Sequence, residues 1–398
     1  MNPPVRADHI GSLMRPEELL KIRSALHKKQ YDPEPLPEEA ERITNEAIAG
    51  AVRRQQSLFF KSITSGEYDR TIFFSGFLEY LQGMQGQMVP LSRGRKGNPS
   101  MMTLERLGAP HREAAVAIGP IRFVKSNYLV EWERLRRCLP ESQWKYCKMT
   151  VVPITWEHVH LAPGAAYTPE SGYTSDKQYL GDLADAMAEE WRLLHAAGLR
   201  KIQVDDPAWL YFVNDEMRAN CDADALLDLY IWAHNKVLAQ RPSGLHVGVH
   251  LCRGNFPNSR RVMDEPSSYE RIAARLFNEL DYNTFYLEYD TDLCGGFSPL
   301  RQVPVGKNVV LGLVSTKDPE LEDVDSMVRS VYEAADVIAQ GQGRSRQEAL
   351  DCLGVSPQCG FSSLSGGNGK GMTSDIMWQK LELVQDIARK IWPEEHVL

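Results

Sequence analysis

Apolar side chains recur along this chain in two alternating patterns. Between residues 180 and 194, leucine, methionine and tryptophan return at spacings of three and four, which is typical of one face of an α-helix. Gly198 follows as a helix stop, and residues 201–205 form a short run with β-branched side chains, as expected of a strand. The pattern therefore predicts a helix followed directly by a strand.

The same order of elements repeats over most of the chain. Helices are predicted at residues 38–56, 180–194, 225–240, 269–280, 321–340 and 373–391. Strands are predicted at residues 5–10, 57–64, 145–154, 201–205, 245–250, 284–289, 309–314 and 352–356. Eight strands that alternate with helices indicate an α/β protein, and specifically a (β/α)8 TIM barrel that residues 1–398 form as a single domain.

One stretch departs from this repeat. Residues 70–144 fit it poorly and are interpreted as an elaboration on the second crossover. A doubly wound open sheet is the main competing fold, but no Gly-x-Gly-x-x-Gly follows a predicted strand to favour a dinucleotide-binding sheet. The barrel therefore remains the preferred prediction.

Composition and charge narrow the class of partner. The chain is 43% hydrophobic and 25% charged, close to the average of globular proteins, and its net charge of -8 disfavours a nucleic-acid surface. No basic start with an apolar segment and no bilayer-length apolar run is present, so no membrane partner is expected. Seven cysteines cannot all pair, which favours a reducing compartment. We expect a cytoplasmic protein with a small-molecule substrate, whose oligomeric state the sequence does not predict.

Polar residues stand where the predicted strands end. Ser12 follows the first strand, Glu67 the second, and Asp205 and Asp206 the fourth. The fifth strand ends with His250 and Cys252, and Glu288 lies in the sixth. Ser315 to Lys317 follow the seventh strand, and Cys359 follows the eighth. In a barrel the carboxyl ends of all strands meet at one mouth, where active sites are built. The sequence therefore predicts that these distant residues become neighbours.

Four of these residues have the chemistry of zinc ligands. Imidazole nitrogen, thiolate sulfur and carboxylate oxygen all bind Zn2+, and the wide spacing suits ligands on separate strands better than a zinc finger. Taken singly, a cysteine is more often a small core residue and a histidine is usually just hydrogen-bonded, and Cys294 and Cys352 are competing thiols. The candidate set is His250, Cys252, Glu288 and Cys359.

The acidic residues Glu67, Asp205 and Asp206 have three interpretations. They bind an ammonium group, act as acid or base, or form surface ion pairs with lysine or arginine. Their positions directly after predicted strands favour a functional role.

An ordered series of motifs resembles a known family. The motifs are Ile10-Gly-Ser12, Ser65-Gly-Glu67, Ile202 to Pro207, His250 to Asn255, Leu287 to Asp290, Val310 to Lys317 and Ser356 to Gly360. In this order they are similar to the catalytic domain of cobalamin-independent methionine synthases, most closely to the short, single-barrel branch. The resemblance extends from about residue 5 to residue 392 and is specific as a set, although each motif alone is short.

The resemblance implies a fold, a cofactor and a reaction. It implies a (β/α)8 barrel whose catalytic zinc is held by the four candidate ligands, and a thiol substrate kept as its thiolate for methyl transfer. Ser12, Glu67 and Asp205 would hold the amino-acid part of homocysteine or methionine. Because four protein ligands close a zinc site, the substrate sulfur must displace a ligand or expand the shell, and Glu288 is the candidate to loosen.

The match departs from methionine synthase on the side of the methyl donor. The chain is too short to hold the second, N-terminal barrel that helps full-length enzymes to bind folate, so the donor of the methyl or alkyl group stays open. Lys317 stands where those enzymes have a histidine, as a substitute acid or an anion contact. Trp156 offers a ring for stacking on a donor, and Ser65 replaces the aspartate that is more common in the short branch.

Three functions stay open on the sequence. The first is methyl transfer to homocysteine. The second, similar to epoxyalkane:coenzyme M transferase, joins another small thiol to a non-folate electrophile or eliminates it. The third is a non-catalytic barrel with structural zinc. Uroporphyrinogen decarboxylase shares the barrel without needing a metal, and the His-x-Cys motif with a late cysteine argues against it.

Overall fold

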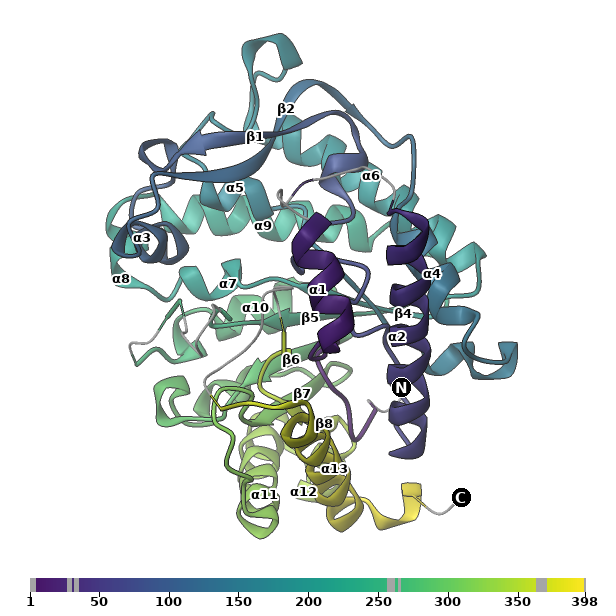
Figure 1. Ribbon diagram of the computed structural model, residues 1–398. Coiled ribbons are helices and arrows are strands. Elements are labelled where there is room, and N and C mark those ends of the chain that lie inside the picture. The colour runs from purple at the N-terminus through teal and green to yellow at the C-terminus, as the bar shows by residue number, and fades with distance from the viewer. Residues whose placement is uncertain are drawn as a thin grey trace.

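A parallel sheet forms the centre of the molecule (Figure 1). The computed structural model describes residues 5–26, 31, 36–255, 262–263, 266–362 and 371–396. Six strands pair in sequence order, β3 to β8, and every pairing is parallel. They are β3 (Met149–Val151), β4 (Lys201–Asp205), β5 (His246–Leu251), β6 (Thr284–Glu288), β7 (Asn308–Val314) and β8 (Leu353–Pro357). The six later strands are confirmed, each within a few residues of its predicted place.

The first two predicted strands are reduced to one bridge each. Ala7 pairs with Val355 of β8, and Ile63 pairs with Cys147 just before β3, both in parallel. Side chains replace part of the backbone ladder, because Lys148 Nζ donates to the carbonyl of His9 at 2.6 Å and Gln203 Nε2 donates to that of Ile10 at 2.6 Å. These two segments flank the six-stranded sheet at its two edges, in the order that a barrel requires.

Helices surround the sheet, and capping side chains determine where some of them begin. The helices are α1 (Glu17–Leu26), α2 (Glu38–Ser57), α3 (Pro99–Arg106), α4 (Tyr128–Arg136), α5 (Trp156–His160), α6 (Asp176–Ala196), α7 (Ala208–Tyr211), α8 (Asp215–Ala219), α9 (Ala223–Leu238), α10 (Ala273–Glu279), α11 (Val324–Gln342), α12 (Arg346–Leu350) and α13 (Ser374–Ile391). The predicted helix 321–340 begins later because the Asp323 side chain accepts from Ser326 N and caps α11. Helix α1, which the sequence pattern did not predict, is an additional element.

The region between residues 70 and 144 contains a structure of its own. Strands β1 (Gln82–Pro90) and β2 (His111–Arg122) pair antiparallel, with α3 in the connection between them. In Figure 1 this pair lies at the top, at the opposite end of the molecule from α11 to α13. β2 packs against α5 and α6. An antiparallel pair was not among the expected elements, although an elaboration was.

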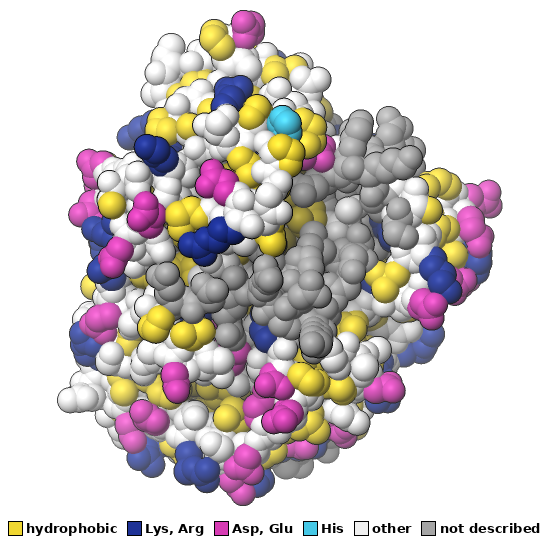
Figure 2. Space-filling view, turned by 60° about the vertical axis from the view of Figure 1, so that its left-hand side comes forward, with side chains coloured by type: hydrophobic (Ala, Val, Ile, Leu, Met, Phe, Trp, Pro, Cys, Tyr) yellow, Lys and Arg dark blue, Asp and Glu magenta, His cyan; other side chains and the backbone are white. Residues whose placement is uncertain are grey.

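Charged side chains of both signs are mixed on the surface (Figure 2). On the face shown in Figure 2, described lysine and arginine side chains are interspersed with aspartate and glutamate and form no continuous basic stripe. Among the helices in the described ranges, none combines the length and apolar character needed to cross a bilayer.

Candidate metal centre

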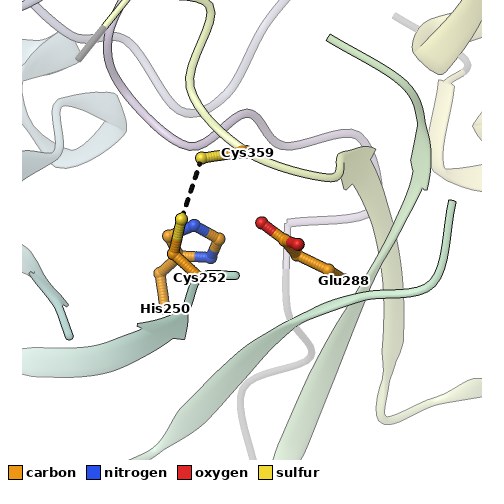
Figure 3. A group of neighbouring side chains, drawn as sticks. All are labelled: His250, Cys252, Glu288 and Cys359. Carbon is orange, nitrogen blue, oxygen red and sulfur yellow. Dashed lines mark hydrogen bonds between the residues drawn. The ribbon is translucent and has the colours of Figure 1, made fainter. Parts of the chain in front are cut away.

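Three neighbouring parts of the sheet bring four potential ligands together. His250 lies in β5 and Cys252 directly after it, Glu288 ends β6, and Cys359 follows β8. One ligand atom from each residue lies within 4.8 Å of all the others, and all four residues are buried. Figure 3 shows the imidazole, the two thiols and the carboxylate around one common space. The four residues, which the sequence placed on separate strand ends, are thus neighbours.

The two thiols differ in acidity. Cys252 Sγ and Cys359 Sγ are 3.3 Å apart. The hydrogen bond from Cys252 outweighs burial and, with that of His250, holds the pKa of Cys359 well below its usual value. The same bond and burial raise the pKa of Cys252. Burial, together with the negative charge of Cys359, raises the pKa of Glu288 to about 8. Several acidic groups are therefore crowded into one buried space, where they repel each other when ionised.

This crowding fits a bound cation. Both carboxylate oxygens of Glu288 are buried without a hydrogen-bond partner in the described ranges. Unpaired buried polar atoms are costly, and a divalent cation would satisfy them while neutralising the thiolates. One nitrogen, two sulfurs and an oxygen are a donor set that suits Zn2+. The competing thiols lie elsewhere: Cys352 donates to the Ala349 carbonyl, and Cys294 is not a member of the cluster.

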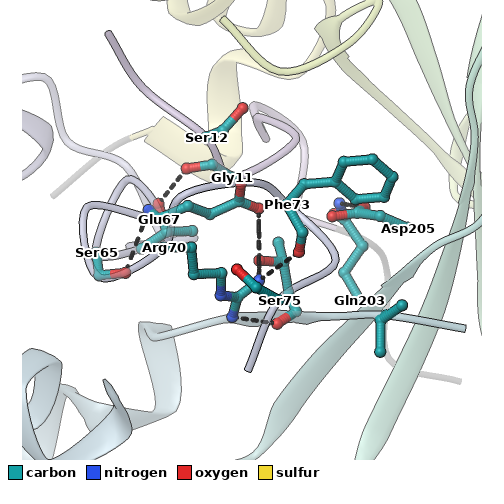
Figure 4. Close-up of polar contacts among 12 residues, drawn as sticks. Gly11, Ser12, Ser65, Glu67, Arg70, Phe73, Ser75, Gln203 and Asp205 are labelled. Carbon is teal, nitrogen blue, oxygen red and sulfur yellow. Dashed lines mark hydrogen bonds and ion pairs between the residues drawn. The ribbon is translucent and has the colours of Figure 1, made fainter. Parts of the chain in front are cut away.

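Two buried carboxylates form a second polar group beside the cluster. In Figure 4 the carboxyl groups of Glu67 and Asp205 reach toward each other. Burial and the negative charge of Glu67 raise the pKa of Asp205 to about 7. Asp205 pairs in register with His250 across β4 and β5, so this acidic pair adjoins the candidate metal ligands. Such a pair is suited to a ligand that brings a positive charge.

Glu67 is held in an unusual backbone conformation. Its φ of 59° is rare for a residue with a side chain. The preceding Ser65 stabilises the turn, because its Oγ accepts from Glu67 N at 3.3 Å. The Glu67 side chain is buried, with Oε1 accepting from Thr150 Oγ1 at 2.7 Å and Oε2 left without a partner in the described ranges. One oxygen of Glu67 is therefore anchored and the other is available.

Ser12 packs against the loop that follows Cys359. Its buried Oγ accepts from Ser362 N at 3.3 Å. A Cβ added to Gly360 would lie only 2.0 Å from Ser12 Oγ, so glycine is required where the loop after Cys359 meets Ser12. Leu13 N donates to the Gly66 carbonyl at 3.1 Å, so the segment that carries Ser12 also adjoins the turn that carries Glu67.

Asp206 lies apart from the acidic pair. Its Oδ1 accepts from Ala208 N at 3.0 Å and its Oδ2 is 3.4 Å from His234 Nε2. Burial raises its pKa to about 7. Asp206 therefore joins the start of α7 to α9, and the structure does not bring it together with Glu67 and Asp205.

Trp156 belongs to an aromatic cluster. Its ring stacks on Phe74 with centroids 4.8 Å apart and meets Phe73 and His160 edge-on or tilted at 5.1 and 4.2 Å. The indole is buried among these three rings, and its Nε1 is buried as well. Phe74 already stacks on the ring that the sequence offered for stacking on a donor.

Lys317 lies near the thiols. Its Nζ donates to Asn255 Oδ1, and Asn255 Nδ2 donates in turn to the Gly360 carbonyl at 3.0 Å. The positive charge of Lys317 adds to the hydrogen bonds of Cys252 and His250 in lowering the pKa of Cys359. A cation therefore stands at the edge of the candidate metal centre, where the sequence placed it.

Sequence reasoning missed three residues that support the acidic pair. Arg70 contacts Glu67 at 3.8 Å, and Thr150 and Gln203 hydrogen-bond to Glu67 and Asp205. A signal for Gln203 existed, since it stands two positions before Asp205 in one strand and therefore shares its face. Thr150 was similarly a polar residue within the apolar third strand.

A known family and a relative from Bacillus subtilis match this chain. The family "Cobalamin-independent synthase, Catalytic domain" matches residues 171–370, a range that contains Asp205 and all four candidate ligands. The uncharacterized protein YxjG of Bacillus subtilis (strain 168) is 31% identical over 397 residues, which are 98% of this chain and 95% of that protein.

Two solved structures have the same fold. A candidate vitamin-B12 independent methionine synthase from Listeria monocytogenes matches with a TM-score of 0.69 at 23% identity, covering 98% of this chain and 99% of that one. A B12-independent methionine synthase from Shewanella sp. W3-18-1, in complex with selenomethionine, matches with a TM-score of 0.69 at 18% identity and covers 99% of each chain. These matches confirm the predicted TIM-barrel fold.

Proposed function

This chain belongs to the cobalamin-independent methionine synthase family, and on that premise we propose that it transfers a methyl group to the sulfur of homocysteine. The observation that carries the proposal is the proximity of two sites. A buried His, Cys, Glu and Cys cluster adjoins a buried pair of carboxylates through the register of Asp205 with His250. One site suits a sulfur and the other suits an ammonium group, the two ends that homocysteine offers.

Four side chains form the part of the site that would bind the metal. We assign Zn2+ to His250, Cys252, Glu288 and Cys359, and the buried oxygens of Glu288, which lack a partner in the described ranges, support this choice. When bound, Zn2+ supplies a means of deprotonating the substrate thiol at neutral pH while leaving the sulfur nucleophilic. Glu288 is the side chain that yields its position to the substrate, since its oxygen is the hardest donor of the set.

The amino-acid end depends on Glu67, Asp205 and Ser12. The two carboxylates face the substrate ammonium group, whose positive charge offsets the mutual repulsion that raises the pKa of Asp205. Ser12, whose segment adjoins both the Glu67 turn and the loop after Cys359, orients the substrate. The selenomethionine complex of the Shewanella relative supports a ligand of this class.

In the proposed reaction, the methyl donor is the molecule that must take up a proton. The homocysteine sulfur forms a bond to the methyl carbon, and the bond from that carbon to the donor breaks. The donor keeps the electron pair and takes a proton. Lys317, beside the cluster, is our candidate for the acid that delivers it. Asp206 and Trp156 support the walls behind the site, at the start of α7 and in the aromatic cluster.

The donor itself is left open between methyltetrahydrofolate, a protein-bound methyl group and a small molecule. Transfer to a thiol that lacks an ammonium group is the weaker alternative, because such a thiol would neither satisfy Glu67 Oε2 nor offset the repulsion between Glu67 and Asp205. A non-catalytic barrel with a structural metal is the weakest alternative, since it does not explain why two carboxylates are buried together.

We also propose that residues 1–398 act as one domain in the cytoplasm. Packing of β2 against α5 and α6 supports a single unit. All seven cysteines are free, which supports a reducing compartment.

The test is zinc content, followed on the same sample by X-ray absorption at the zinc edge with and without homocysteine. The expected result is about one zinc per chain and the gain of one sulfur neighbour when homocysteine is added. A zinc shell that does not change with homocysteine would contradict the proposed function and favour another thiol or a structural metal.

A further inference from the structure

Two neutral side chains support the acidic pair from adjacent strands. Thr150 of β3 and Gln203 of β4 are direct partners in the parallel register of these strands. Thr150 Oγ1 donates to Glu67 Oε1 at 2.7 Å, and Gln203 Nε2 donates to Asp205 Oδ1 at 2.6 Å. Each carboxylate therefore has one oxygen fixed by a neutral donor.

A buried arginine determines which way the Thr150 hydroxyl points. Arg70 Nη1 donates to Thr150 Oγ1 at 3.1 Å, and a guanidinium has no acceptor. The single hydroxyl proton of Thr150 is therefore directed to Glu67 Oε1. Arg70 is itself fixed, since its Nε and Nη2 donate to Glu131 Oε2 at 2.9 and 2.7 Å. Glu67 Oε1 is thus held as an acceptor, and Oε2 remains for the ligand.

A buried lysine determines the orientation of the Gln203 amide. Lys148 Nζ donates to Gln203 Oε1 at 2.8 Å, and also to Asp8 Oδ1 and the His9 carbonyl at 2.8 and 2.6 Å. An ammonium group accepts no hydrogen bond, so the amide of Gln203 must turn its oxygen to Lys148 and its NH2 to the other side. The two protons of that NH2 go to the Ile10 carbonyl and to Asp205 Oδ1.

We propose that Thr150 and Gln203 are positioning residues that fix Glu67 and Asp205 as hydrogen-bond acceptors and thereby select thiols that carry an ammonium group. The inference rests on the proposed function and adds the residues that set its substrate class. Arg70 Nη1 lies 3.8 Å from Glu67 Oε1, the oxygen that Thr150 already holds, so Oε2 remains for the substrate ammonium group. Lys148 is linked to Asp205 through Gln203.

The test compares two thiols on the zinc-loaded protein. Calorimetry measures the dissociation constant of homocysteine and of 4-mercaptobutanoate, which keeps the thiol and carboxylate but lacks the ammonium group. Thr150→Val keeps the shape of the side chain and removes the hydroxyl, and Thr150→Ser restores the hydroxyl. Gln203→Met keeps the length of the side chain and removes both donors. Zinc content and thermal unfolding are recorded for every variant.

We expect Thr150→Val and Gln203→Met to weaken homocysteine binding by about 10-fold or more, since each removes a hydrogen bond to a charged group. Binding of 4-mercaptobutanoate should change by less than about 3-fold, and Thr150→Ser should restore most of the affinity for homocysteine. Weakening of both thiols to the same extent, or of neither, in zinc-loaded variants would overturn the inference alone. A parent protein that does not prefer homocysteine over 4-mercaptobutanoate would overturn both the proposed function and this inference.

Discussion

Cys252 and Cys359 are close enough for one hydrogen to be shared between their sulfurs, and they come from opposite ends of the second half of the chain. In the absence of a cation, two ionised thiols at this distance and a nearby carboxylate would repel each other strongly. A bound cation would relieve this repulsion, so we expect both sulfurs to contribute mainly to metal affinity. Cys294 offers a matched control, because it is also buried but lies outside the cluster.

Replacement of either cysteine should remove the metal. Cys252→Ser and Cys359→Ser are expected to lower zinc affinity by more than about 100-fold, the upper effect of losing an outer-shell partner, and to abolish activity. Zinc per chain after dialysis, measured by atomic emission, checks this, with Cys294→Ser retaining the parent value. Full zinc content in both variants would refute the assigned ligand set.

Adjacent aspartates at the end of β4 allow a second comparison at the same scale. Asp205→Asn should raise the KM for homocysteine by about 10-fold or more, because it removes a buried charge that faces the ammonium group, while zinc content stays unchanged. Asp206→Asn should leave this KM within about 3-fold and lower thermal stability instead, since Asp206 contacts His234 and α7. Steady-state kinetics of both variants separate the two roles, and an equal effect on KM would contradict the assignment.

At the scale of elements, helix α6 carries a buried carboxyl group that the proposed reaction does not use. Glu190 lies inside the molecule, where the Ser126 hydroxyl donates to its Oε1. Burial raises its pKa to about 8. The folded state therefore holds a proton on Glu190 at neutral pH that the unfolded chain, with an ordinary carboxyl pKa, has already lost.

This difference predicts a pH dependence of stability. Between the ordinary pKa of glutamate and about 8, the folded state binds more protons than the unfolded state, so the contribution of Glu190 to stability falls as pH rises. The slope is at most about 1.4 kcal/mol per pH unit. Glu190→Gln should flatten the free energy of unfolding over this window, as measured by urea denaturation at several pH values. Identical pH profiles for the parent and the variant would count against the buried, protonated state.

The elements also show what the sequence could predict and what it could not. The six later strands could be predicted because they are short, nearly continuous apolar runs, as expected of parallel strands that are buried on both faces. The β1 and β2 pair lacks such a signal: β1 is largely exposed or half-buried, and α3 separates its two strands. Asp205 and Asp206 show a missed signal, since strand alternation alone directs neighbouring residues to opposite faces. The setting of Trp156 depends on Phe73 and Phe74, which no local pattern places beside it.

At the scale of the whole molecule, the candidate ligand cluster draws on residues from β5 to the loop after β8, and Ser12 closes it from the other end of the chain. The Gly360 and Ser12 contact has a consequence for synthesis on the ribosome. Strands β3 to β7 can pair as the chain leaves the ribosome. Cys359, the fourth candidate ligand, and the contact of Gly360 with Ser12 form only after β8 has been made. A chain stopped by premature termination before Cys359 therefore carries three donors without the thiolate of the lowest pKa. On the proposed ligand set, zinc binding with all four donors would therefore require a chain that extends at least to Cys359.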